Sequence, residues 1–528
     1  MIKVMLYPVF PILASSLLLS CHEPDIPVVD PVIHDDEGEE LAPQWNMPRD
    51  EFDGTYTLFF QPDNGDVGDP MPFYDPKARD FKVMYLQNDI PNRTRGVFHP
   101  IWGVKTADLA NYDFMRELIP CGEAGSQDAA IGTGSTVYNP ADGLYYSFYT
   151  GNKLNPKVDE NGQVVMMATS SDFVHWFKRA GFIIKGNDYG YDRNDFRDPC
   201  VFQTQDGIWH MLVSTLNTGR KGVIAEFVSN DLLEWTHAGI FMNMHQDRFY
   251  ECPDVFEMNG WWYMVYSEKH VDVRRVLYFK GRSLEEIKAQ TANRDLPRDE
   301  KAYYLDSRGF YAGKTASDGQ ERYIWGWNPS RPRHDNKNVG IPPREPRWGG
   351  NLVAHRLVQH EDGSLSCAEI ASIASRFSHL SSPSTMTAKP GETLVFGALA
   401  QSNHLSFSIQ ADRKDASFGI SFCRDEEARK YYTVRIVPEG DGTCNIRFSE
   451  DGPDGTGEIQ WIDGCLFTAP SDLNYKISIF NENSVFVLYV NDNACYTNRI
   501  YGIGDHKWSI ESYQGDLVIS EMTVGLMK

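Results

Sequence analysis

A turn motif recurs along the first half of the chain and limits the folds that the chain can adopt. Ser-Ser-Asp-Phe-Val-His-Trp (170–176) reappears as Ser-Asn-Asp-Leu-Leu-Glu-Trp (229–235), each time after a hydrophobic strand pattern. Degenerate copies of the turn lie at 105–112 and 280–287. Small antiparallel sheets that repeat in this way are typical of a β-propeller. A sandwich of unrelated strands would also alternate, but it would not repeat the turn.

Most of the remaining chain consists of short runs in which apolar and aromatic residues alternate between Gly, Asn and Asp turns. Helical periodicity is almost absent, so the pattern predicts an all-β fold. The stretch 367–376 has a modest helical or irregular character and is interpreted as part of a linker. Beyond it, the alternation at 405–409 and 484–490 predicts half-buried antiparallel strands of a β-sandwich.

The first residues have the pattern of an export signal. Met-Ile-Lys is followed by an apolar run that ends at Ser20, directly before Cys21. The run is shorter than the roughly 20 residues that a spanning helix needs, although an uncleaved anchor helix remains an alternative. The pattern resembles bacterial lipoproteins, in which the Cys carries the lipid, so we expect an exported protein anchored through Cys21 at the cell surface or in the periplasm. The Pro-, Asp- and Glu-rich stretch 21–47 is expected to be a flexible tether.

The net charge narrows the class of partner. With a formal charge of −23, the chain would repel nucleic acid and anionic membrane surfaces. A neutral carbohydrate fits this charge better, and membrane contact is expected through the lipid anchor only. We expect a monomer.

Eight cysteines besides Cys21 are scattered along the chain without any Cys-x-x-Cys pair. This spacing matches no zinc or redox motif, so no metal or cofactor is expected. A chain of this size has no need of disulfides, and we expect the cysteines to be mostly buried free thiols.

Three acidic segments stand beside strand patterns and could supply catalytic carboxylates. Asp69 precedes Pro70 in a turn-rich run, Asp198 lies in Arg-Asp-Pro (197–199), and Glu251 lies among apolar neighbours in Tyr-Glu-Cys-Pro-Asp (250–254). Glycosidic cleavage needs two carboxyl groups beside the scissile bond, and a third can bind sugar hydroxyls. Desolvation raises the pKa of a carboxyl group, as a general acid requires. The alternatives are an Asx turn, a strand-capping ion pair and a buried strut, respectively.

The order of these three motifs resembles glycoside hydrolase family 32, whose members hydrolyse β-fructofuranosyl bonds. The likeness also covers segments outside the three motifs: Gly134-Ser135, 310–315, Trp325-Gly326-Trp327, Trp348, 485–492 and 497–500. The resemblance implies a five-bladed β-propeller followed by a C-terminal β-sandwich. With the patterns above, it gives five segments: 1–20 signal peptide, 21–47 tether, 48–356 propeller, 357–384 linker and 385–528 sandwich.

The resemblance also implies roles for individual residues. Asp69 would be the nucleophile, Asp198 the transition-state stabiliser and Glu251 the acid/base of a retaining hydrolase. The residues implied to bind the sugar are Arg197, Gln87, Trp102, Ser135, Asp254 and Trp327.

The first motif departs from the family pattern. The family usually has Trp, an aliphatic residue, Asn, Asp, Pro, Asn and Gly, whereas here Val67-Gly68 precede and Met71-Pro72 follow the Asp-Pro step. Asp66 and Asp75 therefore compete with Asp69 for the nucleophile role, and the loss of the Trp and both Asn is expected to reshape the terminal-sugar pocket. Two other functions stay open: a family 43-like arabinosidase or xylosidase, and a non-catalytic surface glycan-binding lipoprotein.

Overall fold

The computed structural model describes ten stretches of the chain, and the expected signal peptide, Cys21 and the tether lie outside them. The described residues are 56–63, 65–89, 96–243, 249–270, 273–292, 304–329, 348–381, 385–425, 430–449 and 463–528. Strands dominate these ranges, in agreement with the all-β prediction. None of the helices found there has the length and apolar character needed to cross a membrane.

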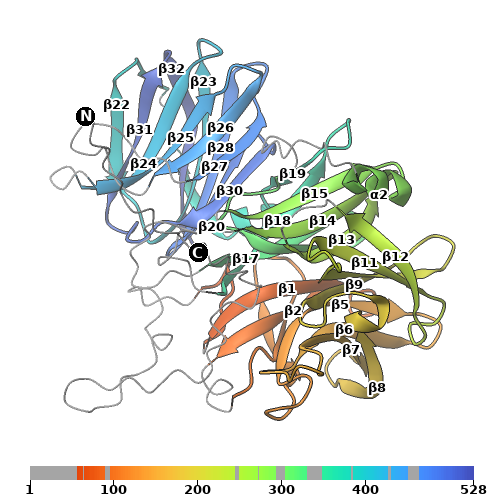
Figure 1. Ribbon diagram of the computed structural model, residues 1–528. Helices are drawn as coiled ribbons and strands as arrows, with labels where there is room; N and C mark the ends of the chain where they lie inside the picture. Colours follow the sequence, from red (N-terminus) through yellow and green to blue (C-terminus); the bar gives the residue numbers. More distant parts are fainter. Residues whose placement is uncertain are drawn as a thin grey trace, which may run out of the picture.

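The first part of the chain forms antiparallel sheets of three, four and eight strands, and its strands lie to the lower right of Figure 1. Its strands are β1 (Gly65–Asp75), β2 (Asp80–Asp89), β3 (Ile101–Thr106), β4 (Asp113–Ile119), β5 (Ala130–Asn139), β6 (Leu144–Asn152), β7 (Gln163–Ser170), β8 (Phe177–Lys185), β9 (Phe196–Gln203), β10 (Trp209–Leu216), β11 (Gly222–Ser229), β12 (Thr236–Asn243), β13 (Phe249–Met258), β14 (Trp261–His270), β15 (Val273–Gly281), β16 (Tyr311–Ser317), β17 (Arg322–Pro329), β18 (Gly350–Gln359) and β19 (Leu365–Ala368). Strands β5 to β8, β9 to β12 and β13 to β15 form separate sheets. Strands β1 to β4 and β16 to β19 share one sheet, in which β1 meets β18 at the single pair Val67 and Gly350.

The first strand of each group faces the first strands of its neighbours. Strand β1 contacts β5, β5 contacts β9, β9 contacts β13, β13 contacts β16, and β16 contacts β1. These five strands thus enclose a common axis. Such radially arranged small sheets are consistent with the predicted propeller.

Each of these five strands also carries a β-bulge. The register shifts at Gly68/Met71 in β1, Gly132/Gly134 in β5, Arg197/Cys200 in β9, Glu251/Asp254 in β13 and Tyr311/Lys314 in β16. A bulge inserts an extra residue and bends the strand, which changes the direction of the local side chains. The five strands that enclose the axis therefore share one backbone irregularity.

The repeated turn found in the sequence closes equivalent hairpins, between β3 and β4, β7 and β8, and β11 and β12. In the third copy, Asp231 accepts hydrogen bonds from the backbone of Leu233 (2.8 Å) and Glu234 (2.9 Å), and the Trp235 indole donates to the carbonyl of Leu232 (3.1 Å). These backbone donors lower the pKa of Asp231. Leu232 takes a φ of 66° and is fully buried. The motif repeats because its Asp fixes the turn while its apolar residue enters the core.

Replacing Asp231 by alanine is expected to lower the free energy of unfolding by about 1 kcal/mol, because two backbone donors lose their acceptor. Urea denaturation followed by tryptophan fluorescence measures this change. Asp188→Ala, on the exposed surface of the 3₁₀ helix Gly186–Tyr189, is the matched control. Equal urea midpoints for the two variants would mean that the turn carboxylate adds nothing to stability.

The prediction that residues 280–287 form a fourth copy of the turn is wrong. The segment leads into helix α2 (Leu284–Ala292), which packs on β15. Ser283 accepts a hydrogen bond from the backbone of Glu286 (3.2 Å), while the Glu286 carboxylate accepts from the backbone of Arg282 (2.5 Å). This Ser-x-x-Glu arrangement is typical of a helix start, and the same letters in the sequence could have indicated it.

The second part of the chain is a pair of sheets (Figure 1, upper left). One sheet holds β20 (Phe377–Ser381), β21 (Met386–Ala388), β23 (Ser402–Ala411), β28 (Asn474–Glu482), β29 (Val485–Val490), β30 (Ala494–Arg499) and β32 (Leu517–Met527). The other holds β22 (Thr393–Ala398), β24 (Ser417–Asp425), β25 (Lys430–Pro438), β26 (Thr443–Ser449), β27 (Asp463–Thr468) and β31 (Lys507–Gln514). Alternate residues of both sheets, such as Phe407 and Phe418, enter one buried cluster, as in a sandwich.

Strand β29 departs from the predicted half-buried pattern, because all six of its residues are buried. Phe486 and Leu488 enter the sandwich core, whereas Val487 and Tyr489 enter the core cluster of the first part. The face expected to meet solvent is covered by the other half of the protein. The two parts therefore share a continuous apolar core.

The predicted linker contains regular structure. Strand β18 runs to Gln359 and pairs with β19, a short helix α3 (Ala371–Ala374) follows, and β20 already pairs with β32 of the sandwich. The cysteine prediction is confirmed: the eight cysteines after Cys21 are free, and six of them are buried.

Candidate active site

The Asp-Pro, Arg-Asp-Pro and Glu-Cys-Pro motifs occupy equivalent bulges in β1, β9 and β13. Asp69, Asp198 and Cys252 take positive φ values of 35°, 59° and 50° and each precedes a proline. A bulge leaves one residue outside the hydrogen-bond ladder and so tolerates a proline. In this register the counterpart of the two aspartates is Cys252, and Glu251 lies in the position of Arg197. The motifs are thus signatures of one backbone feature.

Asp69 is held by side chains from two other strands, β5 of the neighbouring sheet and β17. Thr133 of β5 donates to its Oδ2 (2.5 Å), and the Trp327 indole of β17 donates to its Oδ1 (3.0 Å). Desolvation by the surrounding atoms raises the pKa of Asp69, and the nearby Glu251 adds to this, while the two hydrogen bonds act in the opposite direction. Asp69 as a residue is partly exposed, and the two hydrogen bonds fix the orientation of its carboxylate.

Asp198 is buried beside Asp69. Its Oδ2 accepts a hydrogen bond from the backbone of Cys252 (3.0 Å), and its own backbone N–H donates to Thr150 (2.9 Å). Desolvation raises the pKa of Asp198, whereas the charge of Arg197 lowers it and the charges of Glu251 and Asp69 raise it. The charge state of Asp198 thus depends on the charges of Asp69 and Glu251.

Both carboxylate oxygens of Glu251 accept hydrogen bonds. Arg197 donates to Oε1 (3.2 Å), and the hydroxyl of Tyr311 donates to Oε2 (2.5 Å). Arg197 is itself held by Asp195 (2.9 Å) and stacks its guanidinium on the ring of Phe249 (3.7 Å). This arrangement orients the carboxyl group toward the same axis as the two aspartates.

The divergence of the first motif has a steric counterpart. A Cβ atom on Gly68 would lie 2.2 Å from the indole of Trp348, so a side chain such as the family's Asn could not stand there without displacing it. Trp348 stacks on His99 (ring centroids 4.1 Å apart, planes 13° apart) and lies 6.1 Å from Trp327. Both Trp348 and His99 are partly exposed. An aromatic wall therefore stands next to Asp69 where the family motif carries a polar side chain.

Two of the other predicted sugar-binding residues, Gln87 and Trp102, lie on β2 and β3. Gln87 is buried on β2 opposite Val67, two residues before Asp69, and accepts from Tyr85 (3.1 Å). Trp102 stacks on Phe114 (5.4 Å) and packs against the large core cluster. A packing role thus accounts for Trp102 without any sugar.

Ser135 and Asp254 make contacts that hold strands together. The Ser135 hydroxyl donates to the carbonyl of Pro199 (2.9 Å) and accepts from the backbone of Val201 (2.8 Å), which joins β5 to β9. Asp254 accepts from the backbone (2.9 Å) and hydroxyl (2.6 Å) of Thr315, which joins β13 to β16. Their predicted sugar contacts stay predictions.

The two competitors of Asp69 have other partners. Asp75, at the far end of β1, accepts from the hydroxyl of Tyr145 (2.9 Å) and the backbone of Lys77 (2.9 Å). Asp66 accepts from Gln61 (2.8 Å). Neither carboxylate occupies the bulge.

Sequence reasoning missed two hydroxyl groups that contact the carboxylates. Tyr311 lies in a segment already matched to the family, so its place before the bulge of β16 was an available signal. Thr133 lies between two glycines, and nothing in the surrounding sequence predicts its contact with Asp69. The assembled site has three carboxyl groups and one guanidinium, an arrangement suited to stabilising positive charge on a bound sugar ring.

Two family models match the chain in succession. The one described as "Glycosyl hydrolases family 32 N-terminal domain" matches residues 59–367, and "GH32, BT1760-like, C-terminal domain" matches residues 364–524.

Individual proteins match as well. Raffinose invertase of Escherichia coli is 22% identical over 478 residues, which cover 84% of this chain and 89% of that protein. Sucrose-6-phosphate hydrolase of Staphylococcus xylosus is 24% identical over 279 residues, half of this chain and 54% of the relative. Among solved structures, fructan 1-exohydrolase IIa from Cichorium intybus aligns with a TM-score of 0.70 at 16% identity, covering 89% of this chain and 96% of the other.

Proposed function

The chain belongs to glycoside hydrolase family 32, and from this premise we propose that it is a retaining β-fructofuranosidase that acts on fructans or fructo-oligosaccharides. One observation carries the proposal: Asp69 and Asp198 occupy equivalent bulges on strands around one axis, and Glu251 lies next to the third bulge with both oxygens engaged. Two carboxyl groups with different environments are what glycosidic cleavage requires.

The proposed reaction proceeds in two displacements. An Asp69 oxygen forms a bond to the anomeric carbon of the fructosyl unit, while the bond to the leaving oxygen breaks and Glu251 gives that oxygen its proton. A water molecule then gives its proton to Glu251 and adds to the anomeric carbon, which releases fructose and regenerates the Asp69 carboxylate. Asp198 would bind ring hydroxyls whose hydrogen bonds strengthen as positive charge develops.

Thr133 and Trp327 support the role of Asp69 as nucleophile. Their hydrogen bonds hold the two carboxylate oxygens in place, so that an oxygen is oriented before the substrate arrives. Tyr311 and Arg197 do the same for Glu251, the proposed acid/base.

The preference for fructans over sucrose is the finer part of the proposal. Gly68 and Trp348 support it, since an aromatic surface replaces the polar side chain of the usual motif and would favour the apolar face of a sugar ring. The structural neighbour from Cichorium intybus is a fructan exohydrolase, and one of its structures is a complex with 1-kestose.

We expect purified protein to release fructose from levan, inulin or short fructo-oligosaccharides faster than from sucrose, and to leave arabinan and xylan intact. With methanol as acceptor, a double displacement should yield the methyl β-fructofuranoside, because two inversions restore the starting configuration. Product analysis by NMR measures both results, with Asp198→Asn protein as the control for contaminating activity. A methyl α-fructofuranoside would exclude the double displacement.

Family membership sets aside the family 43 alternative, and the remaining competitor is a glycan-binding protein without activity. Isothermal titration that detects fructan binding by a protein unable to release fructose would favour that function.

The proposal has three further parts: the number of blades, the domain boundaries and the lipid anchor. We infer five blades because five first strands contact one another in a closed ring, and we keep 48–356, 357–384 and 385–528 as the proposed boundaries. Lipid anchoring through Cys21 is supported by the sequence pattern alone. Mass spectrometry of the mature N-terminus would test it.

A further inference from the structure

Strand β30 of the sandwich contacts β17 and the segment that leads into β16, and these two strands supply hydrogen-bond donors to the reacting carboxylates. Strand β17 carries Trp327, which donates to Asp69, and β16 begins at Tyr311, which donates to Glu251. Tyr311 and Trp327 are direct cross-strand partners. Any contact that fixes the ends of these two strands therefore fixes both donors.

Arg499, the last residue of β30, binds the end of β17. Its guanidinium donates to the carbonyls of Asn328 (2.9 Å) and Pro329 (3.1 Å), the two residues that follow Trp327. It also donates to the side chain of Asn351 on β18, which in turn donates to the carbonyl of Phe59 (2.9 Å). Arg499 is 1% exposed, so these bonds are shielded from solvent.

A second group of contacts binds the segment before β16. Thr497 donates its backbone N–H (2.7 Å) and its hydroxyl (2.5 Å) to Asp306, and the Ser307 hydroxyl donates to the Thr497 carbonyl. Gly309 lies so close that a Cβ atom on it would stand 2.1 Å from the same carbonyl. Asn328 closes the loop by donating to the carbonyl of Gly309 (2.7 Å).

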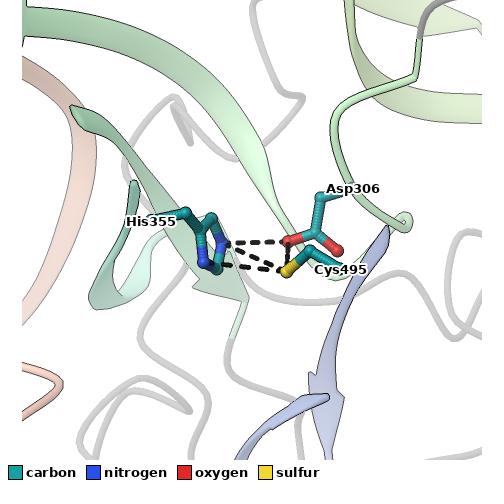
Figure 2. Close-up of side chains that lie close together, drawn as sticks. All are labelled: Asp306, His355 and Cys495. Atoms are coloured by element: carbon teal, nitrogen blue, oxygen red, sulfur yellow. Dashed lines mark hydrogen bonds and ion pairs between the residues drawn. The ribbon is translucent and has the colours of Figure 1, made fainter. Parts of the chain in front are cut away.

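The buried cluster of Asp306, His355 and Cys495 belongs to this interface (Figure 2). The three side chains come from the loop before β16, from β18 and from β30. His355 contacts Asp306 (3.0 Å) and Tyr489 (2.8 Å), so each of its ring nitrogens has a partner. Desolvation keeps the pKa of the Cys495 thiol well above its usual range, which disfavours the thiolate that a metal would need. We interpret the cluster as a structural hydrogen-bond network.

We propose that the C-terminal sandwich takes part in catalysis through Arg499, a positioning residue that holds Trp327 against the Asp69 carboxylate. This inference rests on the proposed function. It assigns to the sandwich a role beyond covering the apolar face of the first part. Loss of Arg499 would free the end of β17 and lengthen the bond from the Trp327 indole to Asp69.

The acid limb of the pH profile distinguishes positioning from general stabilisation. Asp69 attacks as a carboxylate, so kcat/KM falls as the pH falls through its pKa. A hydrogen bond donated to the carboxylate lowers that pKa. Weakening the Trp327 bond should therefore move the acid limb to higher pH, with kcat/KM on that limb reduced about tenfold, the size expected for one hydrogen bond to a charged group.

The test is a double-mutant cycle in the full-length protein. Arg499→Met and Trp327→Phe should each move the acid limb upward, and the double variant should move it no further than Trp327→Phe alone. Arg275→Met is the matched control, since Arg275 is a buried arginine that donates to a sandwich carbonyl (Gly464, 2.8 Å) from β15. Arg275→Met should leave the acid limb in place.

The measured shifts of the acid limb decide whether Arg499 positions Trp327. An unshifted acid limb in Arg499→Met, or additive shifts in the double variant, would overturn the inference. If Arg499→Met does not fold, Arg499→Lys replaces it in the cycle and should produce a smaller shift in the same direction. A wild-type protein without any β-fructosidase activity would refute the proposed function instead, and calorimetric melting curves show that each variant is folded.

Discussion

Replacing Asp69 by asparagine is expected to lower kcat on fructo-oligosaccharides by on the order of 10⁴- to 10⁶-fold, as loss of a covalent nucleophile does in other hydrolases. The amide cannot form the fructosyl intermediate, although its oxygen can still accept from the Trp327 indole while its NH2 group donates to the Thr133 hydroxyl. Substrate affinity should change little, because the shape of the site is preserved. Fructose release under saturating substrate measures kcat, and titration calorimetry measures affinity.

Asp75→Asn is the matched control for Asp69→Asn, since both residues lie on β1 and Asp75 competes with Asp69 on sequence grounds. Its partners Tyr145 and Lys77 are structural, so it should lower the melting temperature and leave kcat within about twofold. The reverse result, a loss of turnover in Asp75→Asn with Asp69→Asn active, would move the nucleophile to the other end of the strand.

The pH dependence of the wild-type enzyme gives a check without any mutation. Burial raises the pKa of Asp69. Since the ionised form attacks, kcat/KM should begin to fall at a pH above the range usual for an exposed aspartate. An acid limb at or below that range would contradict the environment described for Asp69.

Glu251→Gln is expected to lower kcat by roughly 10²- to 10⁴-fold, because the leaving oxygen loses its proton donor and the water loses its base. The loss should be smaller for an aryl fructoside, whose leaving group departs without protonation. Azide should restore turnover of such a substrate, since this anion attacks the fructosyl intermediate without a base and yields fructosyl azide.

Glu257→Gln is the control on the same strand, six residues further along β13 and exposed. It should retain full activity. A Glu251→Gln enzyme with unchanged rates on both substrate types would show that Glu251 is not the acid/base.

Much of the fold followed from local sequence. The Asp turn was visible because its backbone contacts and its buried apolar residue lie within seven positions. The helix at Leu284 was missed because its cap, Ser283 and Glu286, lies inside a degenerate copy of that turn. The double burial of β29 was hidden for another reason: an alternating strand shows which face is apolar, and contacts from distant sequence decide whether the other face meets solvent.

The sequence predicts those parts of the site whose residues are neighbours along the chain. Asp198 and Glu251 stood out because bulge, proline and acidic residue are adjacent in the sequence. Thr133 and Trp327 reach Asp69 from β5 and β17, strands that are distant from β1 in the sequence, and only the tertiary fold brings them together. The contact between Gly68 and Trp348 joins residues 280 positions apart. The sequence therefore shows that the polar side chain of the family motif is missing, but it does not show that the Trp348 indole takes its place.

The ring of bulges bears on how such a site could arise by duplication of a blade. A copied strand carries the irregular backbone with it, so every copy has an axial position ready before any chemistry is selected there. Asp69 and Asp198 use this position for carboxylates, while Cys252 and Ala312 hold it with a thiol and a methyl group. The bulged backbone would then precede the catalytic side chains in the history of the protein. The inherited scaffold would need only single substitutions to move charge from one copy to another.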